Sequence, residues 1–457
     1  MAVKKSVWFG IAAAALLGPV APAGAQTFQE ALALAYNNNP QINIARSTGR
    51  ATDENVSIAQ AGNRPRISAS GSYGAQDLQI GAPTGRVGYA SNPASMSVTL
   101  VQPLFTGFQV ENGVKQAEAS VLAQREALRN TEQQVLYSAA QIFMEVIRDQ
   151  ALVALQESNT KFLSEQVRAA KDRFGVGEGT QTDVAQAEAR YQLAVSQLNA
   201  ARATLNASRA TFRQIVGVEP KKLTGSVPVE KLFPKKIEAA VSAGQSEHPA
   251  IRSSVHNVDV AAFNVKVLEG QLLPQLSAQA GVSRQWDQSP SAHSTNSASV
   301  GLNLTVPIYQ GGSEYAKVRQ AKEQLGTARI QVDLARDQVR QAVVAAWGSL
   351  QAAGASVAAA RAQVEADQLA LNGVVEEQRV GQRTTLDVLN AQTELVNARS
   401  NLVTAETNRV VLAFQLAQAI GRLDSGHLNL RVTRYDPSQH YNAVKDSWFG
   451  LRTPDGR

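Results

Sequence analysis

Two long stretches of this 457-residue sequence repeat each other at a fixed spacing, and this repeat constrains the fold more than any other feature. Near its start the spacing is 209 residues, since Pro65-Arg66-Ile67-Ser68-Ala69 corresponds to Pro274-Gln275-Leu276-Ser277-Ala278. Further along the spacing becomes 204 residues and stays constant, as in the pairs Pro103 and Pro307, Asp183 and Asp387, and Gly217 and Gly421. Self-similarity at a fixed period indicates copies of one structural unit. Because a constant register tolerates no insertions, we expect two copies of a rigid, rod-like unit.

The repeat divides the chain into five segments. We expect a processed leader over residues 1–25, a first repeat over 26–217, a linker over 218–240, a second repeat over 241–421 and a tail over 422–457. The linker is rich in Pro and Lys, and the tail carries scattered polar residues. Both are therefore predicted to be irregular and to join the repeats at equivalent points.

The N-terminal residues have the pattern of a secretory signal peptide. Lys4 and Lys5 precede the apolar run from Val7 to Leu17, and Ala23-Gly24-Ala25 supplies small residues for cleavage. The alternative is an N-terminal membrane anchor, but the run is shorter than the ~18 residues that a spanning helix needs. We therefore expect the chain to be exported and to begin near Gln26. No later segment has a long uncharged apolar run, so any membrane span should consist of β-strands.

Composition excludes several classes of site. The absence of cysteine rules out disulfides, zinc–thiolate centres and thiol nucleophiles, and five His with three Met favour neither a metal nor a cofactor. We find no phosphate-binding glycine loop, no HExxH and no nucleophile elbow, so we expect no enzyme, and His248 and His256 to be structural. The net charge of +6 could suggest nucleic acid, but Lys and Arg alternate with acidic residues, which indicates solvated helix faces and no nucleic-acid partner.

Each repeat contains long helices with a seven-residue apolar period. Apolar residues recur at Val114, Val121, Leu128, Val135 and Ile142, and a small-residue row follows later at Ala187, Ala194, Ala201, Ser208 and Ile215. A strict heptad period predicts left-handed coiled-coil packing. No proline interrupts residues 107–172, which predicts a helix of roughly 100 Å. These helices alone are also compatible with a soluble coiled coil.

Between the helices the period changes from seven to two. Strands are predicted at about 66–80 and 92–104 in the first repeat, and at about 275–288 and 296–308 in the second. One face of each strand is apolar and the other carries Ser, Gly, Gln and Asn. A half-buried soluble sheet shows the same alternation, but an exported chain with uncharged polar faces favours membrane strands around a lumen.

Four strands do not close a membrane barrel, for which about eight is the minimum. Open sheet edges are not tolerated in lipid. We therefore expect several chains to contribute to one barrel.

Each repeat also breaks at a glycine-containing turn remote from the strands. The turns read Arg173-Phe174-Gly175-Val176-Gly177-Glu178-Gly179-Thr180 and Gln378-Arg379-Val380-Gly381-Gln382-Arg383-Thr384. Gly177 and Gly381 can adopt the positive φ that ends a helix, and Thr180 and Thr384 are suited to cap the next one. Asp183 and Asp387 fall in the first helical turn, where the dipole favours a carboxylate. Helix-start electrostatics explains both residues; the alternative is a symmetric ring of Asp387 carboxylates that narrows the lumen and favours cations.

Taken together, this arrangement resembles the TolC family of outer-membrane efflux proteins over nearly the whole mature chain. The resemblance rests on the duplicated helix–hairpin–helix plan, on Gln102-Pro103-Leu104-Phe105 with Gly107, on Val306-Pro307-Ile308 with Gly311-Gly312, and on the turn from Val380 to Ala391. It implies a mainly α fold with a membrane β-barrel, in which a homotrimer supplies 12 strands and the helices form a periplasmic α-barrel. Residues 218–240 and 422–457 would form an equatorial belt.

The resemblance also implies a passive export duct for drugs or polypeptides, working with a periplasmic adaptor and an inner-membrane RND or ABC transporter. The implied gate and constriction residues are Asp387, Arg383, Asn390, Thr182, Asp183 and Gln378. The implied adaptor-docking residues are Val176, Gly177, Glu178, Val380, Gly381 and Gln382.

Three positions depart from the family pattern. Asn390 stands where some members place a second acidic residue, and Gln378 where some place an aromatic latch residue. Gln26, not Cys, follows the signal site, which argues against the lipid-anchored branch. A structural coiled-coil protein of the cell envelope is the alternative function, although it does not explain two strand hairpins at matched positions.

Overall fold

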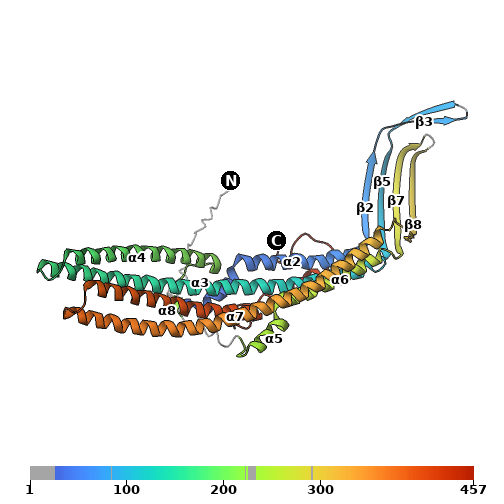
Figure 1. Ribbon diagram of the computed structural model, residues 1–457. Coiled ribbons are helices and arrows are strands. Elements are labelled where there is room, and N and C mark those ends of the chain that lie inside the picture. Colours follow the sequence, from blue (N-terminus) through green and yellow to red (C-terminus); the bar gives the residue numbers. More distant parts are fainter. Residues whose placement is uncertain (1–25, 84, 222, 225–232, 290–291, 457) are drawn as a thin grey trace, which may run out of the picture.

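The computed structural model describes residues 26–83, 85–221, 223–224, 233–289 and 292–456. The expected signal peptide and residues 225–232 of the linker lie outside the described residues. Figure 1 shows a long helical body with a curved sheet rising from one end. The sheet and the helix turns thus occupy opposite ends of the molecule.

The two repeats contain the same long helices. These are α3 (Gln109–Gly175) and α4 (Gln181–Val216), and their counterparts α7 (Ser313–Arg379) and α8 (Thr385–Ile420). All four bounds of the second pair lie 204 residues after those of the first. The 67 residues of α3 correspond to about 100 Å of helix, so the predicted uninterrupted rod is confirmed.

Shorter helices complete each repeat: α1 (Phe28–Asn38), α2 (Pro40–Gln60), α5 (Ile237–Glu247) and α6 (Pro249–Gly270). α2 and α4 follow each other along α3, as α6 and α8 do along α7 (Figure 1). At the first junction Asn39 Nδ2 donates a hydrogen bond to the Ile215 carbonyl at 2.9 Å. At the second, a Cβ on Gly421 would lie 2.8 Å from His248 Cα, so only glycine allows the two helix ends to meet. Each repeat therefore pairs one continuous rod with one interrupted rod.

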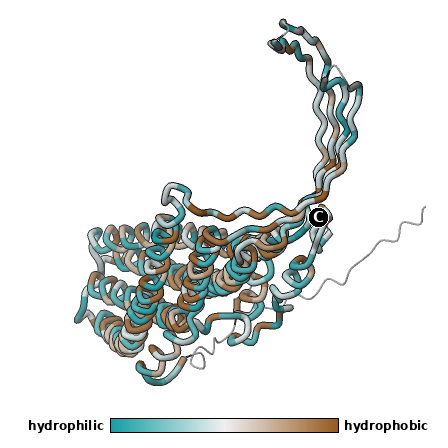
Figure 2. The backbone as a smooth tube through the Cα atoms, turned by 90° about the vertical axis from the view of Figure 1, so that its right-hand side faces the viewer, coloured by the Kyte–Doolittle hydropathy of each residue, from teal (hydrophilic) through white to brown (hydrophobic). Residues whose placement is uncertain are grey.

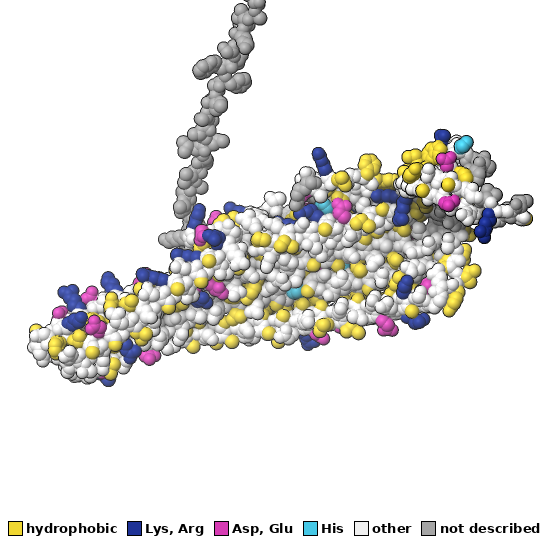
Figure 3. Space-filling view, turned by 90° about the horizontal axis from the view of Figure 1, so that it is seen from above, with side chains coloured by type: hydrophobic (Ala, Val, Ile, Leu, Met, Phe, Trp, Pro, Cys, Tyr) yellow, Lys and Arg dark blue, Asp and Glu magenta, His cyan; other side chains and the backbone are white. Residues whose placement is uncertain are grey.

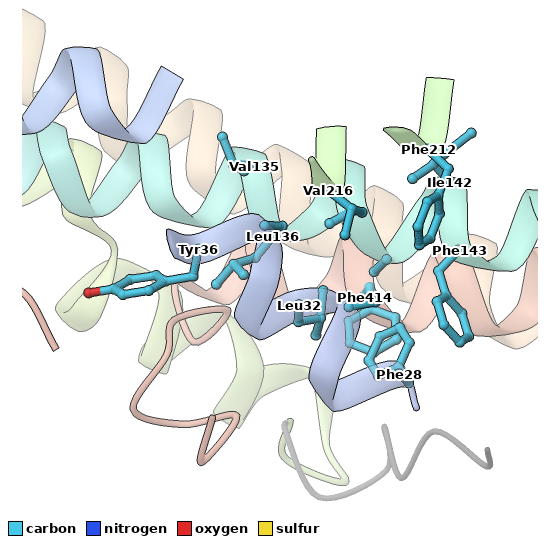
Figure 4. Close-up of a cluster of buried hydrophobic side chains, with 14 of the residues drawn as sticks. Phe28, Leu32, Tyr36, Val135, Leu136, Ile142, Phe143, Phe212, Val216 and Phe414 are labelled. Atoms are coloured by element: carbon cyan, nitrogen blue, oxygen red, sulfur yellow. The ribbon is translucent and has the colours of Figure 1, made fainter. Parts of the chain in front are cut away.

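An aromatic cluster forms the core where these junctions lie. Phe28 of α1 packs edge-on against Phe143 of α3 and also contacts Phe414 of α8, with centroids 5.1 Å apart in both pairs. Figure 4 shows these rings together with Leu32, Leu136 and Phe212. Because the cluster joins helices from both repeats, it fixes the two rods of one repeat against those of the other.

Four antiparallel strands form one sheet in the order β2 (Arg66–Tyr73), β5 (Ala94–Phe105), β7 (Gln275–Ser289) and β8 (Ala292–Thr305). The sequence placed the first strand over 66–80, but the structure ends β2 at Tyr73 and forms a separate hairpin from β3 (Gln76–Ala82) and β4 (Gly85–Ser91). Pro93 lies at this break and has no N–H to donate, and its carbonyl accepts from Gly74 N instead. β8 also begins four residues before the predicted 296 and ends at Thr305, ahead of Pro307.

The strand register separates the side chains of the sheet into an apolar and a polar face. One cross-strand row joins Ala69, Val98, Val282 and Ala298, and the next joins Ser70, Ser97, Ser283 and Ser297. Figure 2 shows the sheet as a curved ribbon standing clear of the helices. Both faces and the outer edges of β2 and β8 are therefore uncovered within one protomer.

The tail is more regular than its composition predicts. Arg422 makes two hydrogen bonds to the Glu247 carboxylate of α5, at 2.8 and 2.9 Å, and residues further on form α9 (Pro437–Val444) along α2. The linker is shorter than predicted, because α5 begins at Ile237, inside the predicted range 218–240. A short parallel pair, β1 (Gln26–Thr27) with β6 (Leu223–Thr224), ties the start of the described chain to the linker.

Among the described residues, α7 is the one helix long and apolar enough to cross a bilayer by composition alone. The expectation that no segment after the leader has a long uncharged apolar run is therefore wrong for residues 341–360. Such a helix is weak evidence for a membrane span, because core helices have the same composition. Here only 22% of its apolar window is buried within the protomer. The rest of that surface is available for packing against another chain.

Candidate functional site: the helix turns remote from the sheet

The turn between α7 and α8 is a compact helix-ending motif. Gly381 has φ of 78°, and its N–H donates to the Gln378 carbonyl at 3.0 Å, while Gln382 N–H donates to the Glu377 carbonyl at 2.9 Å. A left-handed glycine with these two bonds satisfies the last carbonyls of α7. The prediction that Gly381 ends the helix is confirmed.

Thr384 and Asp387 then start α8 through a reciprocal capping box. Thr384 Oγ1 accepts from Asp387 N at 3.2 Å, and Asp387 Oδ2 accepts from Thr384 N at 2.9 Å and from Thr384 Oγ1 at 2.8 Å. These hydrogen bonds, first those from Thr384 and then the charge of Arg383, hold the pKa of Asp387 below its usual value. Asp387 is therefore an ionised, partly exposed carboxylate at a helix start.

The turn between α3 and α4 repeats this construction. Gly177 has φ of 79°, Thr180 caps α4, and Asp183 Oδ2 accepts from Thr180 N at 3.1 Å. The same hydrogen bonds lower the pKa of Asp183. Both predicted caps are thus confirmed, and Asp183 and Asp387 are electrostatically equivalent.

The two turns differ in one ion pair. Arg383 Nε donates to Glu377 Oε2 at 2.8 Å, which connects the start of α8 to the end of α7. The pKa of Arg383 is raised by Glu377 first and by Asp387 next. The first repeat has Gly179 in place of Arg383 and Arg173 in place of Glu377, so it has no equivalent ion pair.

Two arginines of the first repeat contact the second repeat directly. Arg173 Nη2 donates to Thr385 Oγ1 at 3.4 Å, and Arg190 Nη2 donates to Asn390 Oδ1 at 3.2 Å. Gln378 Nε2 also donates to Thr385 Oγ1, at 3.3 Å. Asn390 and Gln378, which depart from the family pattern, therefore both belong to polar contacts that hold the turn region together.

Below these contacts the hairpins share a buried amide pair. Gln392 Nε2 of α8 donates to Asn159 Oδ1 of α3 at 3.0 Å, and both side chains are buried. Leu389 packs beside Leu163 and Ala187 of the other hairpin. A buried amide pair fixes the relative height of the two hairpins, since any slip would leave polar groups unpaired.

The outer surface of the turns is exposed. Val176 and Val380 are 74% and 70% exposed, although both are β-branched apolar residues. Figure 3 shows Lys, Arg, Asp and Glu side chains gathered at this end, whereas the face in view carries mainly hydrophobic and neutral side chains. Each turn thus presents an apolar tip surrounded by charges of both signs. Thr182, Glu178 and Gln382 complete this exposed surface.

The sequence alone did not identify Arg173, Arg190 or Glu377 as members of this site. Arg173 and Glu377 occupy equivalent positions of the two repeats, 204 residues apart, and carry opposite charges. This difference between the repeats could have indicated that the two turns make different ionic contacts. Arg190 carries no such signal, because its partner Asn390 belongs to the other hairpin. Within the described residues no group of His, Asp and Glu could hold a metal ion.

Comparison with known proteins decides the assignment. Residues 31–218 and 241–422 match the outer membrane efflux protein family, which accounts for both repeats. The chain belongs to this family. It is 46% identical to the outer membrane efflux protein BepC of Brucella suis, over 98% of this chain and 97% of BepC. The resemblance to TolC noted in the sequence is thereby confirmed.

More distant relatives share the architecture. The alkaline protease secretion protein AprF of Pseudomonas aeruginosa is 25% identical over 79% of this chain and 77% of its own. The structure superimposes on the CmeC outer membrane channel of Campylobacter jejuni with a TM-score of 0.77, at 16% identity, over 92% of this chain and 89% of CmeC. The fold is therefore that of an outer-membrane channel with long helices and a four-stranded sheet.

This outer membrane efflux protein is a transport protein and not an enzyme, and its place is the outer membrane with a periplasmic extension. The alternative of a structural coiled-coil envelope protein is set aside, because the family match covers both hairpins as well as the helices.

Proposed function

We propose that three copies of this chain form a passive tunnel through the outer membrane and periplasm, and that the helix turns gate it. The observation that carries the proposal is the four-stranded sheet, which is apolar on one face, polar on the other and open at both edges. Each part of the proposal rests on a surface that one protomer leaves uncovered.

The apolar face has the height of a bilayer. It runs along β7 from Leu276, paired across to Phe105, up to Trp286, which lies in the same row as Tyr73. Near its upper limit the row of Arg284 and Asn296 is polar, and the Arg284 guanidinium lies over the Trp286 ring, 5.2 Å from its centroid. Ten residue steps of about 3.3 Å, tilted by about 45°, give roughly 23 Å, close to the ~25 Å apolar band of outer-membrane barrels. Aromatic residues at both limits match the girdles that such barrels place at the two interfaces.

The opposite face suits the wall of a water-filled lumen. Ser70 and Ser97 lie with their hydroxyl oxygens 2.8 Å apart, and Ser72 and Ser95 at 2.7 Å. No Asp or Glu interrupts the rows on this face between Ser68 and Ser72. Uncharged hydroxyls hydrate the wall without binding one sign of solute strongly.

The open edges of β2 and β8 require partners, because lipid does not tolerate unpaired backbone groups. Three protomers of four strands supply 12, which is within the range that closes a barrel. Neighbouring protomers would also cover the exposed apolar residues of α7, among them Ile330 and Leu334. The described part of the linker and α9 lie on the helical body and would form the equatorial belt.

At the turns, Asp387 would form a ring of three carboxylates around the tunnel axis, with Asn390 as a neutral second ring. The ion pair of Arg383 with Glu377, together with Gln378, would restrain the α7–α8 hairpin in the closed state. Thr182 and Asp183 of a neighbouring protomer would provide the facing surface. The absence of the ion pair from the α3–α4 turn supports different roles for the two hairpins.

The exposed turn tips would dock a periplasmic adaptor that links the tunnel to an inner-membrane RND or ABC transporter. Val176, Gly177 and Glu178 form one tip, and Val380, Gly381 and Gln382 the other. Their two-fold repetition around a trimer gives six similar apolar tips. The cargo would be drugs or polypeptides, since the named relatives include both an efflux protein and a protease secretion protein.

Planar-bilayer recording of Asp387→Asn tests the constriction. Asparagine retains an oxygen that accepts from the Thr384 amide but removes the charge, so we expect the channel to form and its cation preference to fall several-fold. Asp436→Asn is the matched control, because Asp436 is also a carboxylate at a helix start, remote from the turns, and its Oδ1 accepts from Ser438 N at 2.9 Å. Equal selectivity in the wild type and in Asp387→Asn would remove Asp387 from the constriction.

A further inference from the structure

The C-terminal tail runs along α2 to Arg64, just before the first strand of the sheet, and there exposes three large apolar side chains. Trp448 is 63% exposed, and Phe449 and Leu451 are fully exposed. Three such residues within four positions form a concentrated apolar segment on the surface of the tail.

The segment just before them is held firmly. Val444 is buried, and His440 Nδ1 lies 2.9 Å from Asp53 Oδ2 of α2, with both side chains largely buried. The Tyr441 ring lies beneath the Arg125 guanidinium of α3, at 5.3 Å. α9 is thus attached to α2 and α3 by a buried histidine–aspartate contact, a cation–π contact and apolar packing.

The attachment continues up to the apolar residues themselves. The Ser447 carbonyl accepts from Ser57 Oγ at 3.0 Å and from the Arg64 guanidinium. The same guanidinium lies over the Trp448 ring, 4.8 Å from its centroid. Trp448 is therefore placed by defined contacts, while most of its ring is left free.

This position coincides with the membrane boundary of the proposed barrel. Continuing the pairing of β2 with β5 places Arg64 level with Pro103, which pairs with Ser277, one residue from Leu276 at the lower limit of the apolar band. The polar headgroup layer of a bilayer extends ~5–8 Å beyond its hydrocarbon core on each side. Trp448 thus lies at the height of the periplasmic headgroups.

We propose that residues 448–452 insert into the periplasmic leaflet of the outer membrane as an interfacial anchor, with phospholipid as the partner. Trp448 would sit at the headgroup level, Phe449 and Leu451 would reach the acyl boundary, and Arg452 would remain at the phosphates. The anchor continues the apolar band of the sheet, and it rests on the proposed membrane orientation of that sheet. It fixes the equatorial belt against the bilayer.

Single-tryptophan proteins test this anchor. The described chain has three tryptophans, Trp286, Trp347 and Trp448, while Trp8 lies in the expected signal peptide. One variant, Trp286→Phe with Trp347→Phe, retains Trp448, and a second, Trp347→Phe with Trp448→Phe, retains Trp286 on the apolar face of the sheet. Both full-length mature proteins are reconstituted into phosphatidylethanolamine–phosphatidylglycerol vesicles with and without lipids brominated near the headgroup.

We expect brominated lipid to remove roughly half of the Trp448 emission, with a blue shift relative to free tryptophan, as interfacial location requires. Trp448→Gln with Phe449→Gln and Leu451→Gln should leave the Trp286 quenching unchanged. Solvent-like Trp448 emission without quenching would overturn the anchor and leave the tail in water. Blue-shifted but unquenched emission would also overturn it, because the tail would then pack on a neighbouring protomer. If Trp286 itself is unquenched, the membrane sheet fails, and with it the proposed function.

Discussion

At the scale of single residues, Asn39 and His248 occupy equivalent positions of the two repeats and cap the helix that follows with different side chains. Asn39 Oδ1 accepts from Gln41 N at 2.8 Å at the start of α2, and His248 Nδ1 accepts from Ala250 N at 3.2 Å at the start of α6. An imidazole accepts through Nδ1 only while that nitrogen is unprotonated. Burial lowers the pKa of His248 from 6.5 to about 4, in agreement with this role.

His248 therefore links folding stability to pH. Between pH 6.5 and 4 the unfolded chain binds a proton that the folded chain excludes. The contribution of His248 to the free energy of unfolding is therefore complete above pH 6.5 and is lost as the pH falls towards 4. The loss for this largely buried group is about 3 kcal/mol at most. We expect His248→Asn, which reproduces Asn39, to reduce the fall in Tm between pH 7.5 and 4.5 as measured by circular dichroism. A pH dependence equal to that of the wild type would contradict this assignment.

At the scale of elements, the heptad period and the repeat predicted the long helices, their turns and their caps. These features depend on local contacts, since a glycine with positive φ and a Thr–Asp capping box act within one turn. Gly381, Thr384 and Asp387 could therefore be placed from spacing alone. The sequence did not predict the break between β2 and β3, because the alternation of side chains continues past Tyr73. The break arises on the opposite strand, where Pro93 has no N–H to donate.

Contacts between hairpins could not be predicted in the same way. Arg190 and Asn390 are 200 residues apart, and nothing in the period of either helix indicates that they meet. The aromatic cluster joining α1, α3 and α8 is also a product of tertiary packing. Sequence repeats specify each rod, whereas the alignment between rods depends on these long-range contacts.

The turn between α7 and α8 allows a direct test of adaptor docking. Gly381 has φ of 78°, and a Cβ at this position would have no neighbouring atom within 4 Å, so Gly381→Val strains the backbone by about 1–2 kcal/mol without a clash. The chain has no cysteine, so Gln382→Cys provides a unique crosslinking site. We expect Gly381→Val to abolish crosslinking of this cysteine to the adaptor while the trimer persists.

Gly373→Val is the matched control, since Gly373 is an unobstructed glycine within α7 with ordinary helical backbone. It should crosslink as the parent does. Normal crosslinking of Gly381→Val would instead move the docking site away from the turn.

At the scale of the whole molecule, each protomer is incomplete. The four-stranded sheet has two open edges, and most of the apolar window of α7 is uncovered. The helices are rigid rods fixed to one another at the aromatic core, so association of three protomers would continue the barrel into the tunnel without refolding any element. The same sheet accounts for both properties: its apolar face suits the outer membrane, and its open edges make association necessary.

The most direct test of this account combines the mass of the detergent-purified mature protein with its single-channel conductance. We predict a species of three protomers that withstands mild detergent, dissociates on heating, and forms small cation-selective pores in planar bilayers. A monomer, or a trimer without pore activity, would contradict the proposal that three open sheets close into one barrel.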